Sequence, residues 1–254
     1  MNIEGFWEGA PDLVLDVEQA WDELVNSQGG ERVDKYVGKS PSFDNADYIF
    51  QKDKVVIELK EIQTEFGNKP AFREKFSLLI SKLIEKEPDF FPFRNPLPRW
   101  FFQEYIRIFR PPLSRTLKKA NKQIRETKHY FNIETPTGIA VFVNDGFVSL
   151  GPEEILAIAS NILMHSYSSI DCFIYVTVNR YVEVKGSSEP KLIWAPVYSD
   201  RVQDKIYDFV NLLGEKWGDY LEKKLGPFTS RVQADDSSFL SGAKAIVLPN
   251  EKIG

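Results

Sequence analysis

Hydrophobic residues follow two different periods along the chain, and these periods predict alternating helices and strands. Apolar positions three or four residues apart are typical of amphipathic helices, whereas short runs rich in β-branched residues are typical of buried strands. The helical period covers residues 11–26, 71–86, 100–109, 113–131, a segment that begins after 152, and 200–224. Strand patterns cover residues 32–37, 46–50, a run that starts at 55, 138–144, 171–179 and 191–197. We therefore predict an α/β fold.

Residues 69–112 differ from the rest of the chain in their density of aromatic residues and prolines. A helical period at 71–86, a loop at 88–93 and a second helical period at 100–109 lie within this stretch. Because so short a segment has too little core to fold alone, we predict a single domain over residues 1–254 that carries a helical, aromatic-rich insertion. Large apolar side chains either pack this insertion on the core or offer a docking surface for a homodimer or a protein partner. They are Phe90, Phe91, Phe93, Trp100, Phe101 and Phe102.

Composition sets the broad class of the protein. A hydrophobic content of 43% and an aromatic content of 13% exclude wholesale disorder. The single cysteine, Cys172, excludes an internal disulfide and a cysteine-based zinc cluster, and it suits a reducing compartment. No apolar run is long enough to cross a bilayer, and residues 1–5 lack the pattern of a signal peptide. We therefore expect a cytoplasmic protein with no membrane partner.

The run from residue 45 to 62 places charged side chains inside an otherwise apolar strand pattern. Because side chains alternate along a strand, Glu58 and Lys60 project from the same face. Ionised side chains are seldom buried unless they are paired or bind a metal. A shorter strand at 46–50 precedes them, and the polar turn between the two strands predicts a hairpin. This hairpin brings Asp47 towards Glu58 and Lys60, so two carboxylates and an amine are expected to converge on one edge of a sheet.

The order of Asp47 followed by Glu58-Leu59-Lys60 on a hairpin resembles the PD-(D/E)xK nuclease superfamily, also called restriction-endonuclease-like. An apolar strand that ends in Glu-x-Lys fits the second half of the family motif. The first half usually reads Pro-Asp, and here Ala46 stands before Asp47, so this half departs from the pattern. The alternative is a surface hairpin on which Glu58 and Lys60 form an exposed, solvated ion pair. The two interpretations differ in whether the charged side chains are buried together.

The resemblance implies a fold, a metal site and an activity. The implied fold is a mixed central sheet flanked by helices, with the core order α-β-β-β-α-β and the helical insertion as an addition. The family holds Mg²⁺ through its two acids, so the resemblance implies Asp47, Glu58 and the Leu59 carbonyl as ligands, with Mn²⁺ able to substitute. It implies that Lys60 orients the attacking water. Most of the family acts on DNA in restriction, phage defence or repair, and phosphodiester hydrolysis in such a setting is the implied function.

The resemblance also points to accessory residues. Many family members carry a Glu on the first helix, and Glu18 flanks the apolar stripe of that helix; an ordinary exposed side chain is the alternative. A subset carries a glutamine or lysine on the helix after Glu-x-Lys, which here corresponds to Gln123 and Lys122. The two histidines are too isolated for a metal cluster, and no glycine spacing typical of nucleotide-binding loops occurs. Asp171, at the start of a strand pattern, is expected to support the fold, with a minor role at the site left open.

The helix predicted at 113–131 carries a basic face in a chain whose net charge is −5. Between Arg107 and Lys128 there are eight basic residues and one acid. Basic residues grouped on one helix face supply salt-dependent contacts to phosphates, and we therefore expect nucleic acid, DNA in the first place, as the partner. The alternative is a solvated face whose charge is balanced by acids on a neighbouring segment. The basic residues of this face are Arg115, Lys118, Lys119, Lys122 and Arg125.

Two classes of function follow from these patterns. The first is a metal-dependent nuclease. The second is a non-catalytic binding or interaction protein that keeps the same fold and docks a partner on the aromatic insertion. Buried and convergent side chains of Asp47, Glu58 and Lys60 favour the enzyme, whereas separated side chains favour the binding protein. The spatial arrangement of these three residues therefore discriminates between the classes.

Overall fold

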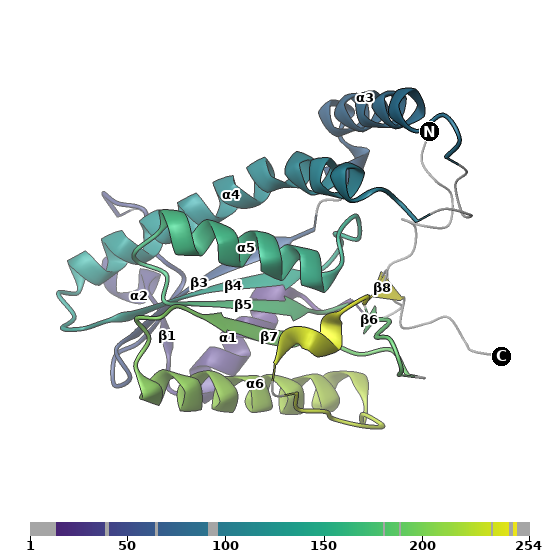
Figure 1. Ribbon diagram of the computed structural model, residues 1–254. Helices are drawn as coiled ribbons and strands as arrows, with labels where there is room; N and C mark the ends of the chain where they lie inside the picture. Colours follow the sequence, from purple (N-terminus) through teal and green to yellow (C-terminus); the bar gives the residue numbers. More distant parts are fainter. Residues whose placement is uncertain are drawn as a thin grey trace.

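A six-stranded mixed sheet forms the centre of the computed structural model, which describes residues 14–38, 41–63, 66–90, 96–179, 181–187, 189–234, 236–243 and 246–247. The strand order is β1-β2-β3-β4-β5-β7 (Figure 1). β3 pairs in parallel with β4, and β4 with β5, whereas the other neighbours pair antiparallel. The prediction of a mixed central sheet is therefore confirmed. The strands are β1 (Glu31–Arg32), β2 (Tyr48–Phe50), β3 (Val55–Ile62), β4 (Thr137–Asn144), β5 (Cys172–Thr177) and β7 (Trp194–Tyr198), while β6 (Tyr181–Val182) and β8 (Ile246–Val247) form a second small sheet.

Helices cover both faces of the six-stranded sheet (Figure 1), which confirms the predicted flanking helices. α1 (Val17–Ser27) and α6 (Asp204–Leu225) lie on one face, and α4 (Arg99–Tyr130) and α5 (Pro152–Ser166) lie on the other. α3 (Pro70–Lys86) lies beside the N-terminal part of α4, away from the sheet. Among the described residues, none of the helices has the length and apolar content that crossing a membrane requires. The remaining helical segments are α2 (Asp34–Val37), η1 (Phe66–Asn68) and η2 (Ser237–Leu240).

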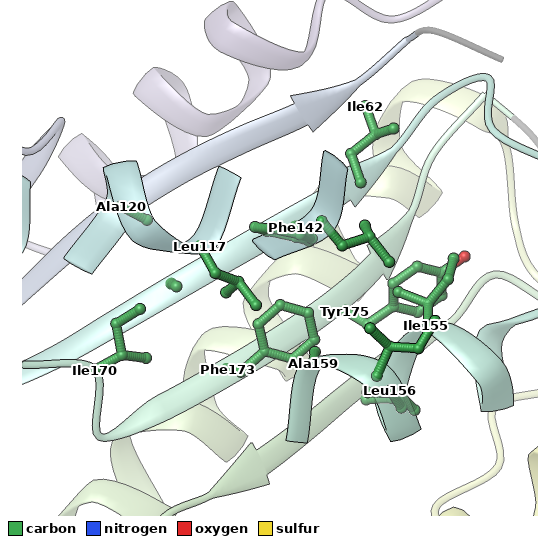
Figure 2. Packing of buried hydrophobic residues seen from close by; sticks show 14 of the residues in the cluster. Ile62, Leu117, Ala120, Phe142, Ile155, Leu156, Ala159, Ile170, Phe173 and Tyr175 are labelled. Carbon is green, nitrogen blue, oxygen red and sulfur yellow. The ribbon is translucent and has the colours of Figure 1, made fainter. Parts of the chain in front are cut away.

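Alternation along β3 separates two hydrophobic cores. Ile57 packs with residues of α1 and α6, whereas Val56 packs with residues of α4 and α5. Figure 2 shows part of the second core, in which Leu117 of α4 packs over the strands. Since every second residue of a strand shares a face, Glu58 and Lys60 lie on the same side of β3 as Val56 and face α4.

α4 is one continuous helix of 32 residues, and the prediction of two helices separated at the proline pair is wrong. Pro111 and Pro112 lack the backbone N–H that an interior helical residue donates, so they normally end or kink a helix. Phe109 and Leu113 flank the prolines and are both buried in the same core. Because packing on both sides of the prolines compensates for the missing hydrogen bonds, the helix runs without interruption from the insertion onto the sheet.

Two predicted helices start later than the pattern indicated. α1 begins at Val17 because the Asp16 side chain accepts a hydrogen bond from the backbone N–H of Gln19 at 2.9 Å and caps the helix. Residues 11–13 of the predicted helix lie outside the described part of the chain. The helix predicted from residue 200 is α6, which begins at Asp204.

Four predicted strands are shorter than the pattern indicated. The strands predicted at 46–50 and 171–179 lose only one or two residues at their ends and become β2 and β5. The strand predicted at 32–37 is wrong beyond Arg32, because Asp34 begins the short helix α2 and favours its first turn electrostatically. The strand predicted at 191–197 enters the main sheet only at Trp194. Lys191 instead forms an isolated bridge with Val182 of β6. The start of the predicted strand therefore pairs with β6, and its later part pairs with β5.

The predicted insertion packs on the N-terminal half of α4 through a small third core. Leu79 and Leu83 of α3 lie against Phe101 of α4, and four further aromatic residues pack partly buried beside them. Phe102 is exposed. Core packing therefore accounts for most of the described aromatic residues of the insertion, and a docking surface for a partner there stays a prediction. The aromatic residues of that predicted surface with a described environment are Phe90, Trp100, Phe101 and Phe102, whereas Phe91 and Phe93 lie outside the described residues.

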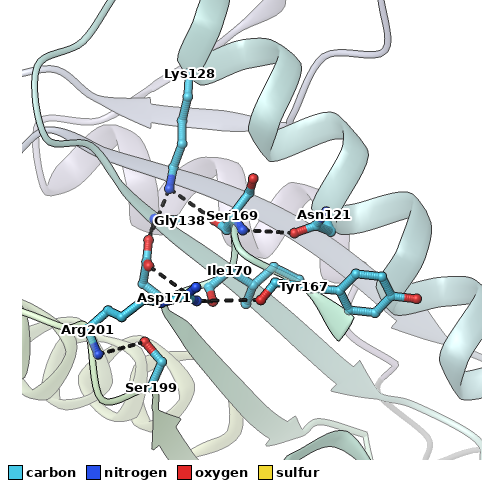
Figure 3. Close-up of polar contacts among 9 residues, drawn as sticks. All are labelled: Asn121, Lys128, Gly138, Tyr167, Ser169, Ile170, Asp171, Ser199 and Arg201. Atoms are coloured by element: carbon cyan, nitrogen blue, oxygen red, sulfur yellow. Dashed lines mark hydrogen bonds and ion pairs between the residues drawn. The ribbon is translucent and has the colours of Figure 1, made fainter. Parts of the chain in front are cut away.

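A half-buried ion pair ties the C-terminal end of α4 to the starts of β4 and β5 (Figure 3). Lys128 Nζ lies 3.0 Å from Asp171 Oδ2 and donates a 2.9 Å hydrogen bond to the carbonyl of Ser169. The same carboxylate accepts a 2.8 Å hydrogen bond from the backbone N–H of Gly138 and lies 3.9 Å from Arg201. Asp171 therefore holds together segments that are far apart in the sequence, as expected for a residue that supports the fold.

Candidate active site

The pairing of β2 with β3 brings Asp47 opposite Glu58. Tyr48 pairs with Ile57 in the antiparallel ladder. The next pair in the same register is Asp47 with Glu58, so the two acids lie across from each other. The backbone carbonyl of Asp47 accepts a 2.9 Å hydrogen bond from the N–H of Val33, which fixes the residue beside β1. The two carboxyl groups are close enough to interact directly. The hairpin thus joins two acids that stand eleven positions apart in the sequence.

The Asp47 side chain is held against the backbone of β3. Its Oδ2 atom accepts a 2.8 Å hydrogen bond from the N–H of Leu59. The N–H and C=O of one residue in an extended strand point to the same edge, so the Leu59 carbonyl faces this edge as well. A carboxylate and a backbone carbonyl therefore lie together where the pairing of β2 with β3 ends.

Glu58 and Lys60 form a buried ion pair. The Lys60 ammonium contacts Glu58 Oε1. The Glu58 side chain is 0% exposed, whereas 18% of the Lys60 side chain remains accessible. The alternative of an exposed pair on a surface hairpin is therefore wrong, and the buried arrangement agrees with the strand pattern.

One side chain of α4 connects both arms of the hairpin. Gln123 Oε1 accepts a 3.0 Å hydrogen bond from Lys60 Nζ, and Gln123 Nε2 donates a 2.9 Å hydrogen bond to the carbonyl of Asn45. Asn45 stands two residues before Asp47, so Gln123 fixes the lysine relative to the segment that carries the first acid. Of the accessory residues that the resemblance implied, Gln123 is the one with a hydrogen bond to a central side chain, that of Lys60.

α4 also holds the segment before the first acid at three further points. Lys122 Nζ lies 2.6 Å from the carboxylate of Asp44, and the carboxylate of Glu126 accepts a 2.9 Å hydrogen bond from the backbone N–H of Asp44. The hydroxyl of Thr127 accepts a 2.7 Å hydrogen bond from the backbone N–H of Ala46, and both residues are buried. Lys122 therefore lies next to the site and supports the segment that leads into it.

Burial and mutual repulsion leave both acids poorly stabilised as carboxylates. Burial, followed by the charge of Asp47, raises the pKa of Glu58 to about 8, although Lys60 partly opposes this rise. Burial also raises the pKa of Asp47, against the lowering effect of the hydrogen bond from Leu59. Glu58 Oε2 is buried and has no hydrogen-bond partner among the described residues. Because buried polar atoms are rarely left unpaired, this oxygen needs either a bound cation or a proton shared with Asp47.

The oxygen atoms of the site fit a hard divalent cation. Carboxylate and carbonyl oxygens are the ligands that Mg²⁺ and Mn²⁺ prefer, and Asp47, Glu58 and the Leu59 carbonyl supply them. Within the described ranges, no group of three or more His, Cys, Asp or Glu side chains is arranged to hold a metal. A cation at this site would therefore complete its coordination with water and substrate oxygens, as Mg²⁺ usually does.

Glu18 is not brought to the two acids. Its carboxylate is 68% exposed and pairs with Arg32 of β1, which also binds Asp22 of α1. The charge of Arg32 lowers the pKa of Asp47, so Glu18 influences the site only through this arginine. Sequence reasoning missed Arg32 and Asp22, because a contact between separate elements leaves no local pattern in the sequence.

Ion pairing divides the basic face of α4 into two halves. Lys122 pairs with Asp44 at 2.6 Å and with Glu126 at 3.8 Å, and Arg125 lies 3.8 Å from Glu126. The alternative of a basic face balanced by neighbouring acids therefore holds for this half. The exposed basic residues of the face that form no ion pair with other described residues are Arg115, Lys118 and Lys119.

Comparisons with protein-family models, with curated proteins and with solved structures give no match for this chain. The chemistry of the site itself, two buried acids and a lysine held against one helix, is therefore the basis for proposing a function.

Proposed function

We propose that the protein is a metal-dependent nuclease that hydrolyses phosphodiester bonds, with DNA as the expected substrate and with a role in restriction, phage defence or repair. The observation that carries the proposal is the buried convergence of Asp47, Glu58 and Lys60. A non-catalytic binding protein gains nothing from two buried acids that repel each other and from an unpaired buried oxygen. The convergence therefore favours the enzyme over the binding protein.

The order of the elements supports the resemblance to the PD-(D/E)xK superfamily. α1, β1, β2, β3, α4 and β4 follow one another in the order α-β-β-β-α-β, with α2, η1 and α3 as additions. β1, β2 and β3 pair antiparallel in sequence, and β4 then joins β3 in parallel after the crossover through α4. This agreement supports a restriction-endonuclease-like core as our interpretation of the fold.

Each residue of the site has a role that follows from its position. Asp47, Glu58 and the Leu59 carbonyl would hold Mg²⁺ or Mn²⁺, which when bound offsets the negative charge of the phosphate and lowers the pKa of a bound water. Lys60 keeps its ammonium beside Glu58 and can donate a hydrogen bond to a water or phosphate oxygen at the acids. Gln123 holds this ammonium in place from α4.

Cleavage assays with the purified protein test the proposal. Plasmid, linear duplex DNA, single-stranded DNA and RNA are each offered with Mg²⁺ or Mn²⁺. Glu58→Gln keeps the shape of the side chain but removes its charge, and we expect it to abolish cleavage. Glu61→Gln is the matched control, because it lies three residues further along β3 on the opposite face and should cleave at the rate of the parent. A parent protein that is inert on all four substrates with both metals would overturn the proposal.

Calorimetry with Mn²⁺ tests the metal site separately from activity. We expect the parent protein to bind the ion and Asp47→Ala to bind it far more weakly, since the substitution removes one of two carboxylate ligands. Equal Mn²⁺ affinity in both proteins would place the metal elsewhere.

A further inference from the structure

The exposed basic face of α4 is electrostatically uneven. The charges of Lys122 and Arg125 lie within 4 Å of Asp44 or Glu126. One to two turns earlier, three exposed basic side chains form no ion pair with a described acid, although the charge of Lys119 helps to lower the pKa of Asp44 and acids outnumber bases in the whole chain. They are Arg115, Lys118 and Lys119, called here the unpaired basic group. Unpaired cations this close together repel one another, so they are the part of the face best suited to bind an external anion.

The unpaired basic group lies directly beside the candidate active site. Lys119 is one helical turn before Gln123, so the two side chains project from the same side of α4. Gln123 contacts Lys60, which places Lys119 about 6 Å further along the helix from a residue of the site. The N-terminal half of α4 extends over the carboxyl ends of the parallel strands (Figure 1). The unpaired basic group therefore lies next to the candidate active site, on the side towards the N-terminus of α4.

The spacing of the unpaired basic group fits an extended polyanion. Arg115 and Lys119 are four residues apart, which is about 6 Å along the helix axis. A single small anion contacts one or two such side chains, whereas the backbone of a nucleic acid presents successive phosphates that neutralise all of them. Arginine and lysine are the usual partners of these phosphates.

We propose that the substrate strand leaves the active site along α4 in the direction of the helix N-terminus, and that the unpaired basic group, near the middle of α4, binds its phosphates. Lys122 and Arg125 make no phosphate contact; with Glu126 they hold the segment that leads to Asp47. This inference rests on the proposed function, because it takes a nucleic acid as the substrate of the same site.

Two double variants on the same helix test the proposal. Lys118→Gln with Lys119→Gln and Lys122→Gln with Arg125→Gln each remove two positive charges, and circular dichroism checks that both proteins are folded. Binding to a labelled duplex and to a labelled single strand is measured by fluorescence anisotropy over a range of salt concentrations, with EDTA present so that no cleavage occurs. We expect the first variant to reduce the slope of log affinity against log salt by about 1.8 on duplex and about 1.4 on single strand. The second variant should keep the slope of the parent.

The outcomes separate this inference from the proposed function. An unchanged slope in the Lys118 and Lys119 variant, or an equal reduction in the Lys122 and Arg125 variant, would overturn the inference even if the parent cleaves nucleic acid. A parent that cleaves no substrate but shows the expected difference between the variants would contradict the nuclease and support the basic group as a nucleic-acid surface. Absence of any binding by the parent in EDTA would overturn the inference, whereas the cleavage assays with Mg²⁺ and Mn²⁺ decide the proposed function.

Discussion

Two groups of charged side chains lie between α4 and the central sheet, and they differ in how completely their charges are paired. Near the C-terminal end of α4, both carboxylate oxygens of Asp171 have partners: Lys128 and a backbone N–H at one oxygen, and Arg201 at the other (Figure 3). At the hairpin, Glu58 faces a second acid, Asp47, and leaves one oxygen without a hydrogen bond among the described residues. Both groups are largely shielded from solvent and both contain a lysine, so shielding alone does not distinguish them.

The difference in pairing separates a group that holds the fold from a group suited to bind a ligand. Breaking a buried ion pair with complete partners destabilises a protein strongly, because one charge is left uncompensated. A buried acid beside another acid opposes folding until a cation or a proton neutralises it. Such local conflicts persist mainly at functional sites. We therefore propose the hairpin as the functional region and the Asp171 network as the structural one, and we expect substitutions in the two regions to have different consequences.

Lys60→Ala should have the largest effect of the substitutions considered. It should lower the cleavage rate without unfolding the protein. The ammonium lies beside Glu58, and we expect its removal to lower the cleavage rate by about 10²- to 10⁴-fold, the range typical of a positioned acid or base. The protein should stay folded, because Glu58 can take up a proton when the lysine no longer opposes its raised pKa. Lys52→Ala, in the exposed turn of the same hairpin, is the control and should cleave as the parent does. Equal rates for Lys60→Ala and the parent would contradict the assigned role.

Asp171→Asn should have the largest effect on stability. It leaves Lys128 buried without an acidic partner, and we expect a loss of about 3 kcal/mol in the free energy of unfolding. Urea titration measures the loss, with the exposed Asp208→Asn as a control that should change stability by less than about 0.5 kcal/mol.

A double variant sharpens this test of the structural group. Asp171→Asn combined with Lys128→Met removes both buried charges, so it should recover part of the stability lost in the single variant. A single variant as stable as the parent would show that the network is not what holds the end of α4.

The pH dependence of stability should reveal the conflict at the hairpin. In the unfolded chain Glu58 ionises near the ordinary glutamate pKa of 4.5, whereas in the folded protein burial beside Asp47 raises its pKa to about 8. The folded protein therefore binds the extra proton between these values, and the stability that this proton contributes is complete below pH 4.5 and is lost as the pH rises through 8. The raised pKa of Asp47 acts in the same direction.

Urea titrations in EDTA between pH 6 and 8 measure this effect. We expect the parent to lose roughly 2 kcal/mol over the interval, at about 1 kcal/mol for each pH unit. Glu58→Gln has no proton to lose at this position, so its stability should change much less with pH and should exceed that of the parent at pH 8. Parallel pH profiles for the two proteins would show that Glu58 ionises in the folded protein as it does in the unfolded chain.

The parts of the site that the sequence predicted are those with a local signal. Side chains alternate along a strand, so Glu58 and Lys60 are predicted to lie on one face. The hairpin is also a local motif, and it brings Asp47 to these two residues. Lys122 and Asp44 are 78 residues apart, and their ion pair depends on how α4 crosses the hairpin. The local sequence pattern contains no information about how α4 crosses the hairpin. The sequence alone therefore could not distinguish Lys122 and Arg125, which pair with acids, from the basic residues of the face that do not.

The fold shows the same limit. The boundaries of β3 and α3 agree closely with their periodic patterns, because each element buries a continuous set of apolar residues that its own period marks in the sequence. The continuity of α4 was missed because a local rule, that prolines end helices, is overridden by the burial of Phe109 and Leu113 in the shared core. Tertiary packing decides such cases, and it is visible only once the sheet is assembled.

Thr127→Val should have the smallest effect, and it tests whether α4 positions the first acid. The substitution keeps the shape of the side chain but removes the hydroxyl that accepts the hydrogen bond from the buried N–H of Ala46. We expect a loss of about 1 kcal/mol in stability, since one buried donor is left unpaired. We also expect a several-fold weaker affinity for Mn²⁺ by calorimetry, because Asp47 follows directly after this anchor point. Thr116→Val is the matched control on the same helix, since that hydroxyl bonds only to the carbonyl of Pro112 one turn earlier. If both valine variants bind Mn²⁺ as tightly as the parent, the contact supports the fold and not the geometry of the metal site.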